Sequence, residues 1–141
     1  MMHRRSLGGG RRLAAIGALI VVTGCLLPWF TVGGDGGLPR EVYRAFNYFP
    51  GVVTFLAGMG TLALVVLPYA AGERPVGIDR GLSFGILAIA ALGGIALWLP
   101  PVLAAPEGLL PDRAYGLWIA AVGAILMARA AFEIGQDRSR R

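Results

Sequence analysis

The chain has 141 residues, of which 56% are hydrophobic and 15% are charged. This balance excludes an ordinary water-soluble domain. The formal net charge is +5, but the arginines flank apolar segments and do not alternate with aromatic residues, so we expect no nucleic-acid partner. With one histidine and one cysteine, the chain has no internal disulfide and no site that needs two or more of these side chains.

Four apolar segments are candidates to cross a membrane. They cover residues 13–32, 51–71, 81–99 and 115–134. A helix needs about 20 residues to cross about 30 Å of hydrocarbon, and the fourth segment reaches this length only by running past Arg129, whose guanidinium then extends to the interface. We therefore predict an all-α fold, a membrane-embedded antiparallel four-helix bundle forming a single domain over residues 1–141, with the lipid bilayer as its surroundings.

Two apolar or aromatic outer loops are expected to cap this bundle. In the first, residues 33–50, a run of glycines precedes the sequence LPREVYRAFNYF, where Pro39 can open a short helix. The apolar residues at helical spacing in this segment are Leu38, Val42, Phe46 and Phe49, which would form one face of the helix. This apolar face predicts that the helix lies in the membrane interface. The second loop, residues 100–112, follows a span ending near Trp98 and is too rich in proline to be helical.

The distribution of arginines predicts the orientation of the bundle. With the N-terminus inside, ten of the thirteen arginines lie in cytoplasmic segments, and the outer loops hold only Arg40, Arg44 and Arg113. Positive charge is enriched on the cytoplasmic side of membrane proteins. We therefore expect a multi-pass protein of the bacterial cytoplasmic (inner) membrane, with both the N- and C-termini in the cytoplasm.

Cys25 has two interpretations. The sequence VTGC, residues 22–25, fits the lipobox of bacterial lipoproteins, in which a small residue precedes a cysteine that is acylated, and a basic tail with an apolar core comes before it. However, the residues after Cys25 are LLPWF, which stay apolar where a lipoprotein becomes polar. Cys25 is either a lipidation site or, as we prefer, a small thiol packed inside the first span.

Small residues four positions apart predict close helix packing within the spans. In lipid, association of helices depends on close backbone approach, which small side chains allow. The pairs and series of this kind are Gly81 with Gly85, Ala90 with Gly94, and Gly116, Ala120, Ala124 and Ala128. Threonines within the spans are expected to donate to helix carbonyls one turn back.

The first span ends in a Pro-Trp-aromatic turn, Pro28-Trp29-Phe30, and a glycine-rich stretch, residues 33–37, follows it. In these features and in its four spans, the chain resembles small bacterial four-span membrane proteins of uncharacterised function. The resemblance covers the whole chain in outline. It implies the fold but no activity.

We expect no enzyme, because the carboxylates of the outer loops are scattered singly among Gly and Pro, and no cofactor or metal site. The preferred hypothesis is a non-catalytic accessory or scaffold subunit of a bacterial membrane protein complex, with other membrane protein subunits as partners. Its outer-face contacts would come from Trp29, Phe30, Tyr43, Phe46, Phe49 and Trp98.

Two other hypotheses stay open from the sequence. The first is a module that binds or transports a lipid or other apolar small molecule, which requires a cavity lined by residues such as Trp29, Phe46 and Trp98. The second is an enzyme at the membrane surface that uses the outer carboxylates, namely Asp35, Glu41, Glu107 and Asp112.

Overall fold

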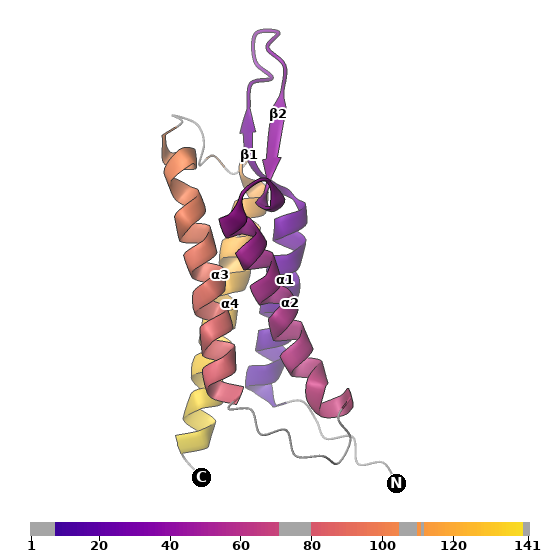
Figure 1. Cartoon of the computed structure of the whole chain (residues 1–141), viewed down its shortest axis with the longest axis vertical. Coiled ribbons are helices and arrows are strands. Elements are labelled where there is room, and N and C mark those ends of the chain that lie inside the picture. Colours follow the sequence, from indigo (N-terminus) through magenta and orange to yellow (C-terminus); the bar gives the residue numbers. More distant parts are fainter. Residues whose placement is uncertain (1–7, 71–79, 105–109, 111, 140–141) are drawn as a thin grey trace.

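The computed structural model describes residues 8–70, 80–104, 110 and 112–139. Within these ranges the chain forms four long helices and a two-stranded hairpin (Figure 1). The helices are α1 (Gly9–Leu26), α2 (Phe49–Ala70), α3 (Arg80–Leu103) and α4 (Tyr115–Ser139). Each is long and apolar enough to cross a membrane. The predicted helical bundle is confirmed, and its four candidate spans are those of a multi-pass membrane protein.

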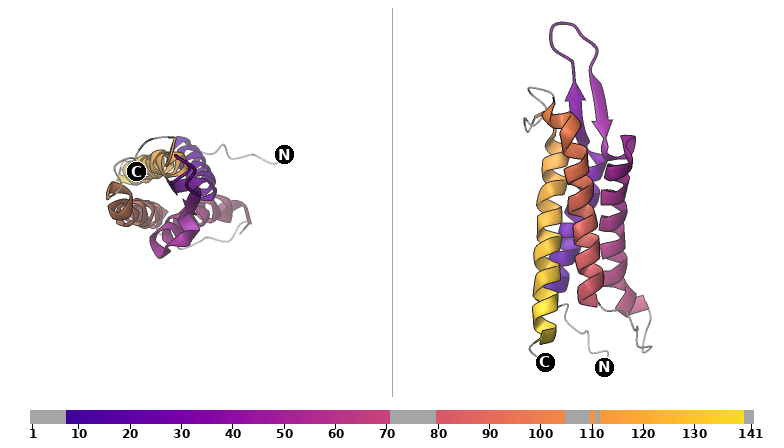
Figure 2. Two further views of the ribbon diagram at one scale, coloured as in Figure 1. Left: turned by 90° about the horizontal axis from the view of Figure 1, so that it is seen from above. Right: turned by 60° about the vertical axis from the view of Figure 1, so that its left-hand side comes forward.

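The four helices form a closed ring in which each helix packs against two others. Helix α1 contacts α2 and α4, and α3 contacts the same two helices from the other side (Figure 2). Large apolar side chains point outward from every helix, among them Ile16, Leu56, Ile89 and Ile125, whereas alanine and glycine fill much of the interior. This arrangement suits lipid, because tails solvate large apolar side chains and small residues let helices approach.

Helices α1 and α4 are in backbone contact along a series of glycines, which we call the glycine seam. On α1 the series is Gly10, Gly17 and Gly24, and on α4 it is Gly116 and Gly123. A Cβ atom on Gly17 would lie 2.9 Å from the Gly123 carbonyl oxygen, and one on Gly24 would lie 2.6 Å from the Ala120 amide nitrogen. These distances leave no room for a side chain, so the seam requires glycine.

Helices α2 and α3 are joined by a threonine. Thr54 Oγ1 lies 3.2 Å from the Pro50 carbonyl oxygen one turn back and 3.2 Å from the Ala91 carbonyl oxygen on α3. Gly94 faces Thr54, and a Cβ atom there would collide with the threonine hydroxyl. Thr54 therefore makes the intrahelical contact expected from the sequence and reaches a second helix as well, a contact that stabilises helix pairs in lipid.

The first helix is shorter than predicted, because α1 ends at Leu26 and does not continue to residue 32. Leu27 is extended, with φ −90° and ψ 162°, since the residue before a proline is sterically disfavoured in the helical region. The next residues form strand β1 (Pro28–Val32). The prediction of a transmembrane helix over residues 13–32 is therefore wrong for residues 28–32, which form a strand.

The prediction of an interfacial helix after Pro39 is wrong. Instead, β2 (Glu41–Arg44) pairs antiparallel with β1, with Phe30 opposite Tyr43, and only the short 3₁₀ helix η1 (Ala45–Asn47) follows. Positive φ angles at Gly33, Gly34, Gly36 and Gly37 let the chain reverse between the strands. Residues 38, 42, 46 and 49 consequently do not share one helical face.

Helix α3 also differs from the prediction, because it continues through Pro100 and Pro101 to Leu103. The prolines lie in its last turn, near the membrane surface, where water can bond the carbonyls left without an N–H partner. Val102 is buried in the core, which holds this last turn against the bundle. The predicted loop thus begins later than residue 100, and residues 105–109 and 111 lie outside the described residues.

Helix α4 runs beyond the predicted end at residue 134, to Ser139. The Arg129 Nε atom lies 3.3 Å from Glu133 Oε1, and both side chains are exposed. The pair is one helical turn apart near the helix end. The guanidinium therefore neither enters the bundle nor interrupts the helix, in agreement with the expected extension of the fourth span.

We predict that Gly24→Ala lowers the free energy of unfolding by about 1–3 kcal/mol, the usual cost of forcing extra atoms into a packed site. The added Cβ atom would overlap the backbone of α4 at Ala120. Unfolding with increasing SDS in mixed micelles, followed by circular dichroism, measures the change.

Gly93→Ala is the matched control, because nothing lies within 4 Å of a Cβ atom at Gly93. We expect this variant to be as stable as the wild type or slightly more stable. Equal losses in both variants would show that close contact at the glycine seam is not what stabilises the bundle.

Candidate functional site

Five aromatic side chains form a continuous cluster where the hairpin meets the helices. The Trp29 and Trp98 rings meet edge to face at 5.5 Å between centroids, and Tyr48 meets Trp98 in the same way at 5.5 Å. Tyr43 continues the series, 6.4 Å from Tyr48 and 6.1 Å from Phe30. We call these residues the aromatic cluster. Edge-to-face pairs contribute stabilisation beyond the area that they bury.

Trp29 ties the aromatic cluster to α1. Its indole Nε1 donates a hydrogen bond of 2.9 Å to the Gly24 carbonyl oxygen. Gly24 belongs to the glycine seam, so the same residue contacts α4 and holds the first residues of β1. The hairpin therefore leaves the bundle in a fixed direction.

The candidate contact residues divide into buried, half-buried and exposed ones, and Phe30 and Tyr43 are half-buried. Trp29 and Trp98 are 0% and 2% exposed, so both rings lie inside the protein. Phe46 and Phe49 are exposed, and Phe46 packs at 5.0 Å against Phe55 of α2. Outer-face contact by the exposed aromatics stays a prediction.

Tyr48, which links Tyr43 to Trp98, is not among the contact residues predicted from the sequence. The aromatic run FNYF, residues 46–49, is the signal that could have indicated it. This run joins η1 to the start of α2, so its side chains lie at the level where the hairpin begins. An aromatic at this position reaches both the hairpin and α3.

On the hairpin, the Tyr43 hydroxyl donates a hydrogen bond of 2.8 Å to Glu41 Oε2. This hydrogen bond and the negative charge of Glu41 raise the pKa of Tyr43 above its ordinary value. Tyr43 therefore keeps its proton at neutral pH and presents a hydrogen-bonded hydroxyl on the hairpin.

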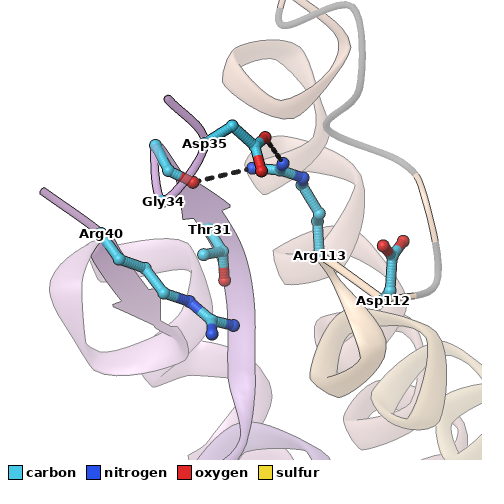
Figure 3. Close-up of a pocket in the computed structure, with 7 residues that line it drawn as sticks. Thr31, Gly34, Asp35, Arg40, Asp112 and Arg113 are labelled. Carbon is cyan, nitrogen blue, oxygen red and sulfur yellow. Dashed lines mark hydrogen bonds and ion pairs between the residues drawn. The ribbon is translucent and has the colours of Figure 1, made fainter. Parts of the chain in front are cut away.

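A polar pocket of about 310 Å³ lies between the hairpin and the turn before α4. We call it the polar pocket. Arg113 spans it: Nη1 donates a hydrogen bond of 3.1 Å to the Gly33 carbonyl oxygen, and Nη2 forms an ion pair with Asp35 (Figure 3). The pocket is lined by Thr31, Gly33, Gly34, Asp35, Arg40, Asp112 and Arg113. Arg113 thereby connects the hairpin to α4.

Two buried polar atoms have no hydrogen-bond partner within the described ranges. They are Thr31 Oγ1, in the wall of the polar pocket, and Trp98 Nε1, in the aromatic cluster. Leaving a buried polar group unpaired costs about 1–3 kcal/mol. The packing around these two atoms has to offset this cost.

Cys25 belongs to α1, and its side chain is fully buried in the core of the bundle. This is the packing expected for a structural thiol. Lipidation of Cys25 stays a prediction, and it would require this residue to leave the helix interior. Among the described residues, no group of three or more His, Cys, Asp or Glu side chains is placed to hold a metal ion.

Comparison of the chain with protein-family models, with curated proteins and with solved structures finds no match in any of the three.

We predict that Trp29→Phe lowers the free energy of unfolding by about 1 kcal/mol for the lost hydrogen bond, with a further cost from the smaller ring. Phe132→Leu is the control, because Phe132 is 66% exposed on α4 and a smaller side chain there leaves no internal gap. Thermal unfolding in detergent measures both. A larger loss from Phe132→Leu would contradict the role assigned to Trp29.

We also predict that Arg113→Gln loosens the hairpin without unfolding the helices. Loss of the contacts to Gly33 and Asp35 should speed amide hydrogen exchange in β1 and β2 about tenfold, which corresponds to about 1.4 kcal/mol. Arg44→Gln, which removes an exposed arginine on β2 outside the pocket, should leave exchange unchanged. Equal exchange in Arg113→Gln and wild type would show that Arg113 does not hold the hairpin.

Proposed function

We propose that this protein is a non-catalytic accessory or scaffold subunit of a bacterial membrane protein complex, and that its hairpin is the docking element. The observation that carries the proposal is the hairpin itself, which extends beyond the ends of the helices (Figure 1). Its exposed apolar side chains include Val32, Leu38 and Val42. Exposed apolar residues on a projecting element are a feature of interaction sites.

The backbone of the hairpin supports the same proposal. The sheet has two strands, so each strand has one edge whose N–H and C=O groups are not paired within the sheet. An edge of this kind accepts a strand from another protein. Charged side chains on open edges disfavour random association, and Arg40, Glu41 and Arg44 supply them here.

The orientation that we propose follows from the arginines. The ends of α1 and α4 that carry most of them face the cytoplasm, and the hairpin lies on the outer side of the cytoplasmic membrane. Partner subunits would then meet the hairpin outside the membrane. The outward faces of the four helices would remain in contact with lipid.

The alternative hypothesis of an apolar binding module required a cavity beside Trp29, Phe46 and Trp98. Trp29 and Trp98 are almost completely buried and Phe46 is exposed, so these three side chains do not line a common cavity. The packing of the aromatic cluster favours the scaffold hypothesis.

Purification in a mild detergent tests the proposal. We predict that the wild-type chain carries another membrane protein at a stoichiometric amount, and that Val42→Asp loses it, because a charge on the exposed strand face opposes an apolar contact. Val42→Ile, which keeps an apolar β-branched side chain, should retain the partner. Circular dichroism checks that both variants keep their helices.

A chain that runs alone in several mild detergents, with no stoichiometric partner, would count against a subunit role. A partner that stays bound to Val42→Asp as firmly as to wild type would move the docking surface away from the hairpin.

A further inference from the structure

The polar pocket contains two charged side chains of opposite sign that are not engaged. Arg40 lies on the hairpin side and Asp112 on the side of α4, with Arg113 and Asp35 between them (Figure 3). Neither Arg40 nor Asp112 has a side-chain hydrogen bond or ion pair to any other residue that the structure describes. The positive charge of Arg113 is already balanced by Asp35.

These charges restrict the ligand that the pocket can hold. A purely anionic ligand would meet Arg40 but would be repelled by Asp112, and a purely cationic ligand would meet the opposite difficulty. A molecule that carries both charges satisfies both side chains. The pocket is also large enough for a small ligand group, at about 310 Å³.

Thr31 of β1 lies in the wall of the pocket. Its side chain is only 4% exposed and its hydroxyl is buried. The charged groups that a ligand in the pocket can reach without a rearrangement are therefore those of Arg40 and Asp112, whose side chains are exposed.

We propose that the polar pocket binds a zwitterionic group with a phosphate and a primary ammonium, as in phosphoethanolamine. Arg40 donates hydrogen bonds to the phosphate, and Asp112 accepts hydrogen bonds from the ammonium. Charge-assisted hydrogen bonds of this kind are about twice as strong as neutral ones. This binding site goes beyond the docking role of the hairpin and does not rest on it.

The location of the pocket favours a lipid headgroup as the source of this group. Asp112 lies three residues before Tyr115, the first residue of α4, so the pocket lies at the level where a membrane-spanning helix begins. Exposed apolar side chains then follow along α4 at helical spacing, namely Tyr115, Trp118, Val122 and Ile125. An acyl chain can lie along this face while its headgroup occupies the pocket.

Native mass spectrometry of the full chain in detergent can test the proposal with three lipids that have the same acyl chains. These are phosphatidylethanolamine, phosphatidylcholine and phosphatidylglycerol. We expect phosphatidylethanolamine to bind about tenfold more tightly than either of the others. The trimethylammonium of phosphatidylcholine has no N–H to donate, and phosphatidylglycerol has no cation for Asp112.

Three variants locate the interaction. Asp112→Asn should remove the preference for phosphatidylethanolamine over phosphatidylcholine, and Arg40→Gln should weaken the binding of all three lipids about tenfold. Arg44→Gln removes the same charge from the hairpin but lies outside the pocket, and it should bind like wild type. Since all three side chains are exposed, we expect unchanged thermal unfolding midpoints.

Soluble glycerophosphoethanolamine distinguishes the two possible sources. If it displaces the lipid at millimolar concentration, a free zwitterion can be the ligand; if it does not, and the preference for phosphatidylethanolamine persists, the ligand is the lipid. Equal binding of the three lipids by wild type would overturn the proposal. The proposal would also be overturned if wild type bound phosphatidylglycerol most tightly and Asp112→Asn left that binding unchanged.

Discussion

The close approach of α1 to α4 determines most of what lies at the hairpin end. A Cβ atom on Gly116 would lie 2.6 Å from the Pro28 carbonyl oxygen and 2.8 Å from that of Gly24. The start of α4 therefore lies directly against the turn by which the chain leaves α1 and enters β1. This contact brings Arg113, three residues earlier, within hydrogen-bond distance of Gly33. The direction of the hairpin and the walls of the polar pocket both follow from a backbone contact that only glycine allows.

The aromatic cluster completes this end of the bundle in a different way. Within lipid, helices gain little from burying apolar side chains, so shape and polar contacts decide packing. At the end of the helices large rings can fill the space between α1, α3 and the hairpin, as Trp29 and Trp98 do. The hairpin is thus held on one side by ring contacts and on the other by Arg113. An element held at both sides can present a constant surface to another molecule.

The length of the apolar segments is enough to predict four spans, because crossing a membrane requires it. The hairpin is harder to predict, since the residues at 38, 42, 46 and 49 fit helical spacing, while the pairing of β1 with β2 depends on contacts across a turn of glycines. Local spacing does not report such pairing. Of the glycine seam, the series at spacing four predicts only Gly116. The others, Gly10, Gly17 and Gly24 on α1 and Gly123 on α4, follow an interval of seven residues. The polar pocket joins residues about 80 positions apart, so no local motif marks it.

The glycine seam also affects the order in which the protein can assemble. It joins the first and the last helix of the described chain, and a growing chain emerges from its N-terminal end first. During synthesis, α2 and α3 are therefore made before the groove on α1 meets its own α4. In that interval the bare backbone surface at Gly17 and Gly24 is open to lipid, to a chaperone, or to the same groove on another nascent copy. Completion of the bundle by the last helix is then also the step that removes a self-association surface from the membrane.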